Sequence, residues 1–161
     1  MLHKFFNTDK SISALIIRLT LGIVILPHGM QKLLGVFGGF GFSATMDAMT
    51  GMGLPAIIVF LIIIGESFGS LSLILGIGTR FSALSLTIIM LGALAIHLPD
   101  GFFMNWMGNQ SGEGFEYHLL AIGLGVSSLL SGGGRFSIDR IISSLIKESG
   151  NKNQKVINQT I

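Results

Sequence analysis

Hydrophobic positions along the chain form four long runs that are separated by shorter polar or glycine-rich segments. A helix that crosses a membrane needs ~20 consecutive, mostly apolar residues, and the first three runs approach or exceed that length. The pattern therefore predicts an all-α membrane protein, a bundle of four transmembrane helices over residues 11–31, 54–78, 81–98 and 116–131. Together these runs predict one transmembrane domain over residues 1–135.

The segment after the fourth run has a different period. Its apolar residues share one face of a helix, and its polar residues share the other. The apolar set is Ile138, Ile141, Ile142, Leu145 and Ile146, and the polar set is Asp139, Arg140, Ser143, Ser144 and Lys147. This pattern predicts an amphipathic helix over residues 136–148, lying on the inner membrane surface and capped by Ser137. Residues 149–161 are polar and are predicted to be a disordered tail.

Composition supports the membrane class and excludes several others. Half of the residues are hydrophobic (50%) and only 11% are charged, whereas a soluble domain carries ~25% charged residues. The mean hydropathy is +0.74, which also excludes intrinsic disorder. A net charge of +2 without a dense basic patch argues against a nucleic-acid partner. Because cysteine is absent, thiol and iron–sulfur chemistry are excluded, and redox chemistry would need an external cofactor.

The basic residues indicate how the chain crosses the membrane. Eight of the ten lie before the first run, between the second and third, or after the fourth: Lys4, Lys10, Arg80, Arg135, Arg140, Lys147, Lys152 and Lys155. The loops over residues 33–53 and 99–115 contain acidic residues but no lysine or arginine. The positive-inside rule therefore predicts that both termini are cytoplasmic and that these two loops face outward.

Ionisable residues inside the apolar runs are the candidate functional groups, since each costs ~3 kcal/mol in a bilayer and so faces the bundle interior or a wet cavity. Glu66 lies halfway along the second run, and Arg18 is expected at a similar depth. The other groups fall in the outer third. As candidate catalytic or proton-transfer groups we take Glu66, His28, His97 and Glu116, and as candidate substrate-binding groups Lys32, His118, Arg18 and Trp106. In the alternative interpretation, pairs such as Arg18–Glu66 or Lys32–Glu116 only lock the bundle.

Two further motifs allow a packing or a binding interpretation. Gly65 and Gly69 form a GxxxG motif around Glu66, which lets a neighbouring helix approach closely. In the outer loops, methionines recur at every third position: Met46, Met49 and Met52, and then Met104 and Met107. Thioethers suit Cu(I), although such a stripe also serves as an apolar face.

Several short motifs, taken in order, resemble the DoxX family of small bacterial membrane proteins. The resemblance covers roughly residues 12–140. It is carried by Arg18-Leu19, Gly22 and His28-Gly-Met-Gln-Lys32, by Glu66, Gly69, Leu75-Gly76 and Thr79-Arg80, by His97-Leu-Pro-Asp-Gly-Phe-Phe103, by Gly114-Phe-Glu-Tyr117, and by Ser137-Ile-Asp139.

The resemblance implies a multi-pass protein of the bacterial inner membrane. Related DoxD-type proteins are subunits of a thiosulfate:quinone oxidoreductase. Mycobacterial DoxX is associated with a membrane oxidoreductase complex that includes a superoxide dismutase and a sulfurtransferase. The DoxA-like second subunit is not contained in this chain, so the resemblance does not imply an enzyme that acts alone.

Three function classes follow from these observations. The first is a redox-linked role with quinone as ligand, in which a histidine donates to the quinone and Glu66 or Glu116 passes protons. The second is a binding or assembly protein without chemistry. The third is small-solute or copper handling, or a haem held between two histidines. The expected partners are the lipid bilayer, quinone, oxidoreductase subunits or a second copy of the chain.

Overall fold

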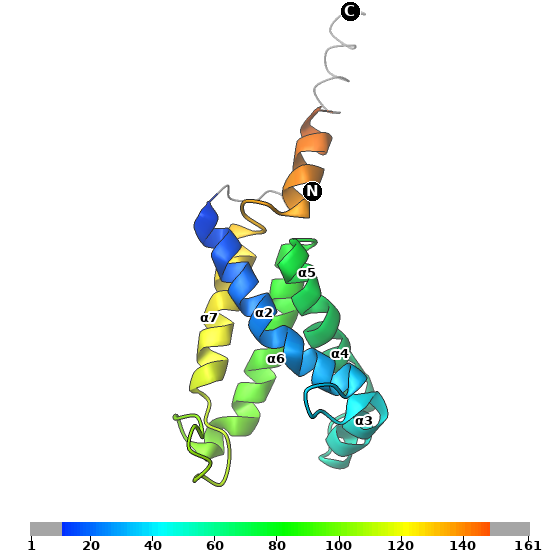
Figure 1. Cartoon of the computed structure of the whole chain (residues 1–161), viewed down its shortest axis with the longest axis vertical. Helices are drawn as coiled ribbons and strands as arrows, with labels where there is room; N and C mark the ends of the chain where they lie inside the picture. The colour runs from blue at the N-terminus through cyan, green and yellow to red at the C-terminus, as the bar shows by residue number, and fades with distance from the viewer. Residues whose placement is uncertain (1–10, 149–161) are drawn as a thin grey trace, which may run out of the picture.

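A computed structural model describes residues 11–148, and all regular structure within that range is helical (Figure 1). The elements are α2 (Ile12–Leu34), α3 (Gly41–Gly51), α4 (Ala56–Ile64), the π-helix η1 (Gly65–Gly69), α5 (Ser70–Leu75), α6 (Thr79–His97), the short 3₁₀ helix η2 (Leu98–Asp100) and α7 (Glu116–Ser131). A last helix occupies residues 138–148. The tail predicted over residues 149–161, and the lysines at positions 4, 10, 152 and 155, lie outside the described residues.

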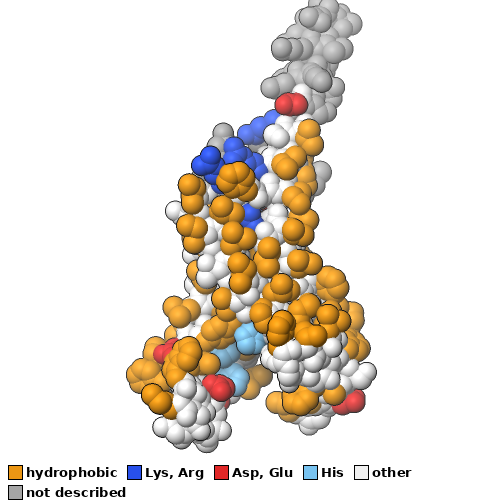
Figure 2. All heavy atoms as spheres, viewed as in Figure 1, with side chains coloured by type: hydrophobic (Ala, Val, Ile, Leu, Met, Phe, Trp, Pro, Cys, Tyr) orange, Lys and Arg blue, Asp and Glu red, His pale blue; other side chains and the backbone are white. Residues whose placement is uncertain are grey.

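Three helical segments are long and apolar enough to cross a membrane. They are Ile12–Leu34, Ala56–Leu75 and Thr79–Asp100. Large apolar side chains on these segments face outward (Figure 2), as expected for helices surrounded by lipid tails. The prediction of an all-α membrane protein is confirmed to this extent. The fourth predicted span corresponds to α7, which has 16 residues, so a fourth crossing and the orientation of the termini stay predictions.

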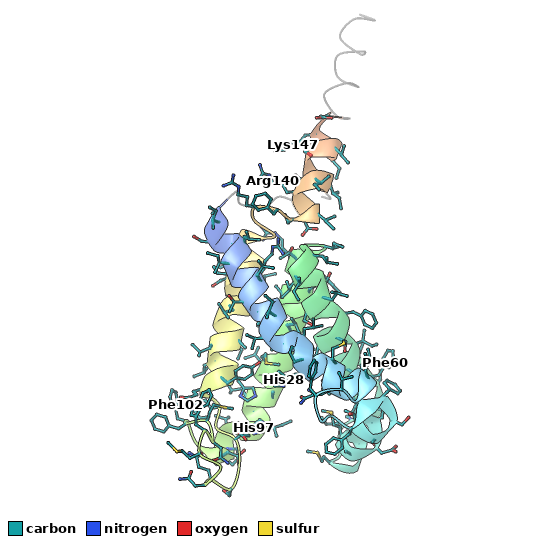
Figure 3. The ribbon with its side chains drawn as sticks, viewed as in Figure 1. His28, Phe60, His97, Phe102, Arg140 and Lys147 are labelled. Atoms are coloured by element: carbon teal, nitrogen blue, oxygen red, sulfur yellow. The ribbon has the colours of Figure 1, made fainter. Side chains whose placement is uncertain are left out.

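The helices pack as a bundle in which α2 crosses the others. α2 contacts α5, η1 and α7, whereas α6 lies along α7. The buried core contains Leu21, Ile25, Leu73, Ala83, Leu86, Met90 and Ala121. We call the end that carries His28 and His97 the histidine end (Figure 3), and the end at which α2 begins the terminal end (Figure 1).

The second apolar run is interrupted by the π-helix η1, which the hydrophobic pattern did not predict. The hydroxyl of Ser70 donates to the carbonyl of Glu66 within this turn. Single π-turns inside α-helices occur frequently at functional sites. Here the π-turn contains Glu66, which is 4% exposed.

Close helix contact at η1 depends on Gly29 of α2. A Cβ at Gly29 would lie 2.5 Å from the backbone nitrogen of Ser67 and 2.6 Å from the carbonyl carbon of Glu66. By contrast, Gly65 and Gly69 of the GxxxG motif face the side chains of Ile89 and Leu86 on α6. Glu66 is therefore held beside a tight contact, as expected, but the glycine that allows backbone contact with α2 is Gly29.

The terminal end is fastened by two charged side chains. Arg18 is 1% exposed and donates to the carbonyls of Leu73 and Ile74 at the end of α5, and to those of Gly133 and Phe136 after α7.

Asp139 is the second of these charged side chains. Its carboxylate accepts hydrogen bonds from the N–H groups of Gly78 and Thr79, at 2.7 and 2.8 Å. These contacts satisfy backbone groups that helix ends leave unpaired.

Candidate functional site

An ion pair between α2 and η1 lies at the centre of the candidate site. Lys32 Nζ is 2.6 Å from Glu66 Oε2, and the side chains are 27% and 6% exposed. The pairs Arg18–Glu66 and Lys32–Glu116, considered from the sequence, are not found among the described residues. His28 and Lys32 are four residues apart on α2 and so share a helix face. Because the ion pair holds a charged lysine against a buried carboxylate, the site can exchange a proton or bind a polar group there.

Aromatic and imidazole rings extend from this pair toward the histidine end. The ring centroids of His28 and Tyr117 are 6.0 Å apart, and those of Tyr117 and His118 are 5.5 Å apart. His118 stacks on His97 at 5.1 Å with an interplanar angle of 21°. Glu66 is near enough to act electrostatically on both His28 and Tyr117. Five of the eight predicted site residues, Lys32 among them, thus form one continuous cluster together with Tyr117.

His97 has a carboxylate partner of its own. Its Nδ1 lies 2.9 Å from Asp100 Oδ2, three residues further along the chain. A carboxylate at Nδ1 fixes the orientation of the ring and leaves Nε2 as the other functional nitrogen. Figure 2 shows the histidines at the base of a notch at this end of the bundle, and Figure 3 places His28 and His97 there.

Several buried polar atoms of the cluster have no hydrogen-bond partner within residues 11–148. They are the hydroxyls of Ser67 and Tyr117 and the Nδ1 atom of His118. A buried polar atom without a partner costs ~1–3 kcal/mol, and native proteins leave few such atoms without a functional reason. These three atoms are therefore available to a polar ligand or to water.

A cavity of about 310 Å³ lies directly beside the ion pair. Its wall includes Lys32 on α2, together with the 38–40 turn and one face of α3. The lining residues are Gln31, Lys32, Gly38, Gly39, Phe40, Thr45, Ala48 and Met49. The volume falls at the small end of the range for ligand pockets, ~300–1,000 Å³. The helix α3, which the sequence analysis treated as loop, supplies three of the eight lining residues.

Glu116 and Trp106 form a separate contact in the loop before α7. Glu116 Oε1 accepts hydrogen bonds from Trp106 Nε1 at 3.0 Å and from the backbone N–H of Met104 at 3.2 Å. The carboxylate of Glu116 thus organises the loop, and Trp106 remains 82% exposed. Their predicted roles in catalysis and substrate binding are not favoured by these contacts.

Arg18 lies away from the cluster. The prediction that it lies at a depth similar to that of Glu66 is wrong. Its acceptors Leu73 and Ile74 lie about two helical turns beyond Glu66. Each of its three guanidinium nitrogens donates to a main-chain carbonyl, so four of the five N–H donors are already bonded to the backbone. We therefore leave Arg18 out of the candidate site.

One residue of the site, Tyr117, was missed by the sequence analysis, although its position between Glu116 and His118 marked it as a candidate. Within the described residues, no group of three His, Asp or Glu side chains could hold a metal ion.

The fold defines a helical membrane protein, with a cluster of polar side chains between its helices. The sequence profile of DoxX matches residues 13–99, so the chain belongs to the DoxX family. It is 28% identical over 115 residues to "Putative oxidoreductase CatD" of Bacillus subtilis (strain 168), which covers 71% of this chain and 76% of that protein. No solved structure matches the chain.

Proposed function

We propose that this chain is a quinone-interacting component of a membrane oxidoreductase complex, and that the cluster around Lys32 and Glu66 is its quinone site. The observation that carries the proposal is a buried ion pair flanked by Tyr117 and His118, whose buried polar atoms have no partner among the described residues. The similarity to a protein named as an oxidoreductase supports the same class of function.

The residues present fit a quinone headgroup. A quinone needs an apolar slot, hydrogen-bond donors for two carbonyl oxygens, and a route for protons. Lys32 and Tyr117 supply donors, and His118 Nδ1 supplies a third in one of its tautomers. When bound, a quinone supplies two-electron, two-proton chemistry. Glu66 is the group that can hold or release a proton at the inner end of the cluster.

The proposal places the chain in the bacterial inner membrane with both termini in the cytoplasm and four crossings. The histidine end then faces outward. This orientation follows from the positive-inside rule, and Arg80, Arg135, Arg140 and Lys147 at the terminal end agree with it. Because the chain has no cysteine, the electrons would come from a partner subunit that carries its own redox cofactor.

The test is quinone binding by the purified chain. Full-length protein in mild detergent is incubated with ubiquinone or menaquinone, and bound quinone is extracted and quantified. We expect near-stoichiometric quinone in the wild type and at least a tenfold loss of affinity in Tyr117→Phe/His118→Leu, because two donors at ~1 kcal/mol or more each are removed.

Ser127→Ala is the matched control, since its hydroxyl on the same helix donates only to the carbonyl of Gly123. It should bind quinone as the wild type does. A wild type that retains only phospholipid, or a double variant that binds quinone normally, would contradict the proposed site.

A further inference from the structure

A groove of about 560 Å³ lies at the terminal end, far from the quinone site. It is lined by Phe136, Ser137, Ile138, Arg140, Ile141 and Ser144, which belong to the connection after α7 and to the first turns of helix 138–148. The wall combines exposed apolar side chains with one guanidinium group. Phe136 is 76% exposed and Ile141 is 60% exposed. A surface of this composition suits a ligand that is both apolar and anionic.

The orientation of helix 138–148 explains why these apolar side chains are exposed. Its buried side chains are the polar Asp139 and Ser143, at 3% and 7% exposure. Asp139 is drawn inward because its carboxylate caps the start of α6. The apolar face therefore points away from the bundle, and Figure 1 shows the helix continuing beyond the bundle end.

Two arginines of the groove region are available for an anion. Arg140 lies in the wall, and the guanidinium of Arg135 lies 5.3 Å from the ring centroid of Phe136, another wall residue. Neither guanidinium donates a hydrogen bond to a described residue. Arg side chains bind phosphate oxygens through paired N–H donors. Figure 3 places Arg140 and Lys147 at this end, and Figure 2 shows basic side chains gathered around an apolar one.

The position of the groove along the bundle selects the kind of ligand. The backbone N–H of Arg135 donates to the carbonyl of Ser11, the residue that precedes α2. Arg135 thus lies level with the start of a membrane-crossing helix. In a membrane, that level is occupied by lipid headgroups, and α2 continues below it with Ile12 and Ile16 exposed at 53% and 58%.

We propose that this groove binds an anionic phospholipid, with the phosphate between Arg135 and Arg140 and the glycerol and upper acyl chains against Phe136, Ile138 and Ile141. The charge balance favours an anionic lipid over a zwitterionic one. Asp139 is committed to the α6 N–H groups, and the groove wall contains Arg140 but no acidic side chain. The proposal does not depend on quinone binding at the opposite end.

Native mass spectrometry of the full-length chain tests the proposal. Protein in mild detergent is titrated with phosphatidylglycerol or with phosphatidylcholine, and the lipid retained after detergent removal is measured. We expect the wild type to retain phosphatidylglycerol in preference. Arg135→Gln/Arg140→Gln should lower that retention roughly 30-fold, since each basic residue near a headgroup contributes ~1 kcal/mol. Lys147→Gln, outside the groove, is the matched control and should retain the lipid.

Two further probes keep the test decisive. Ile141→Gln should weaken phosphatidylglycerol binding but not the weak binding of soluble glycerol phosphate, which distinguishes a lipid from a free anion. Arg135→Lys/Arg140→Lys keeps both charges and should retain a preference for phosphatidylglycerol, even if the Gln variant fails to fold. Equal retention of the two lipids by the wild type, unchanged retention in the Gln variant, or a stable dimer that excludes lipid would each overturn the proposal.

Discussion

Lys32 on α2 and Glu66 on η1, separated by 34 positions in the sequence, form a 2.6 Å ion pair next to a cavity and a chain of aromatic and imidazole rings. The pair joins the first apolar helix to the π-turn of the second. Charged groups within membrane helices are expensive, and pairing reduces that cost. The same pair holds the Glu66 carboxylate at a defined place between the helices.

Removal of one partner of this pair should destabilise the protein more than removal of both. Glu66→Gln leaves a partly buried lysine without its partner, and we expect a loss of about 3 kcal/mol, at the low end for buried pairs because Lys32 is partly exposed. Lys32→Gln/Glu66→Gln should recover part of that loss. Thermal unfolding in detergent for the two single variants and the double variant measures the coupling, and strictly additive losses would show that the two side chains do not interact.

Gly29→Ala should separate α2 from η1. The new methyl group would lie 2.5 Å from the backbone of Ser67, and backbone cannot move aside as the end of a side chain can. We expect a lowered melting temperature together with loss of quinone binding, because the displaced helix carries Lys32. Gly92→Ala is the control, since nothing lies within 4 Å of a Cβ there, and it should be neutral or slightly stabilising. Equal behaviour of the two alanine variants would contradict the close contact.

Arg18→Lys should impair folding even though it keeps the charge. The guanidinium serves four carbonyl groups from two separate parts of the chain, and a single ammonium group cannot reach all of them. With at least two buried carbonyls left unpaired, we expect a loss of roughly 3 kcal/mol or more. The monodisperse fraction after solubilisation and the melting temperature report it, with exposed Lys147→Gln as control. A wild-type melting temperature for Arg18→Lys would show that the charge alone suffices.

Asp139→Ala should loosen the start of α6. The carboxylate accepts from the N–H groups of Gly78 and Thr79, so its loss should cost about 1–2 kcal/mol, as for other helix caps. Hydrogen–deuterium exchange should become faster in the first turn of α6. Ser144→Ala, an exposed residue on the same helix, should leave exchange there unchanged, and a similar effect of both changes would argue against a specific cap.

The sequence alone determined the class of protein and the approximate extent of its helices. Long apolar runs, few charges and the absence of cysteine can be seen directly in the sequence. The runs predict membrane helices because a helix that crosses the lipid needs ~20 apolar residues. The predicted runs over residues 11–31 and 116–131 correspond closely to α2 and α7. Because ionisable groups are costly in a bilayer, the sequence also identified Glu66, Lys32 and the histidines as candidate site residues.

Only the tertiary structure decided which of these groups meet. Depth along an ideal helix suggested Arg18 as the partner of Glu66, but the crossing of α2 brings Lys32 to Glu66 and carries Arg18 to the carbonyls at the terminal end. The π-turn at Glu66, the helix α3 in a predicted loop and the role of Tyr117 also lacked a signal in the hydrophobic pattern. The physical reason is that a hydrophobic period specifies which face of a helix avoids water, whereas helix rotation, crossing angle and close approach depend on packing against distant parts of the chain.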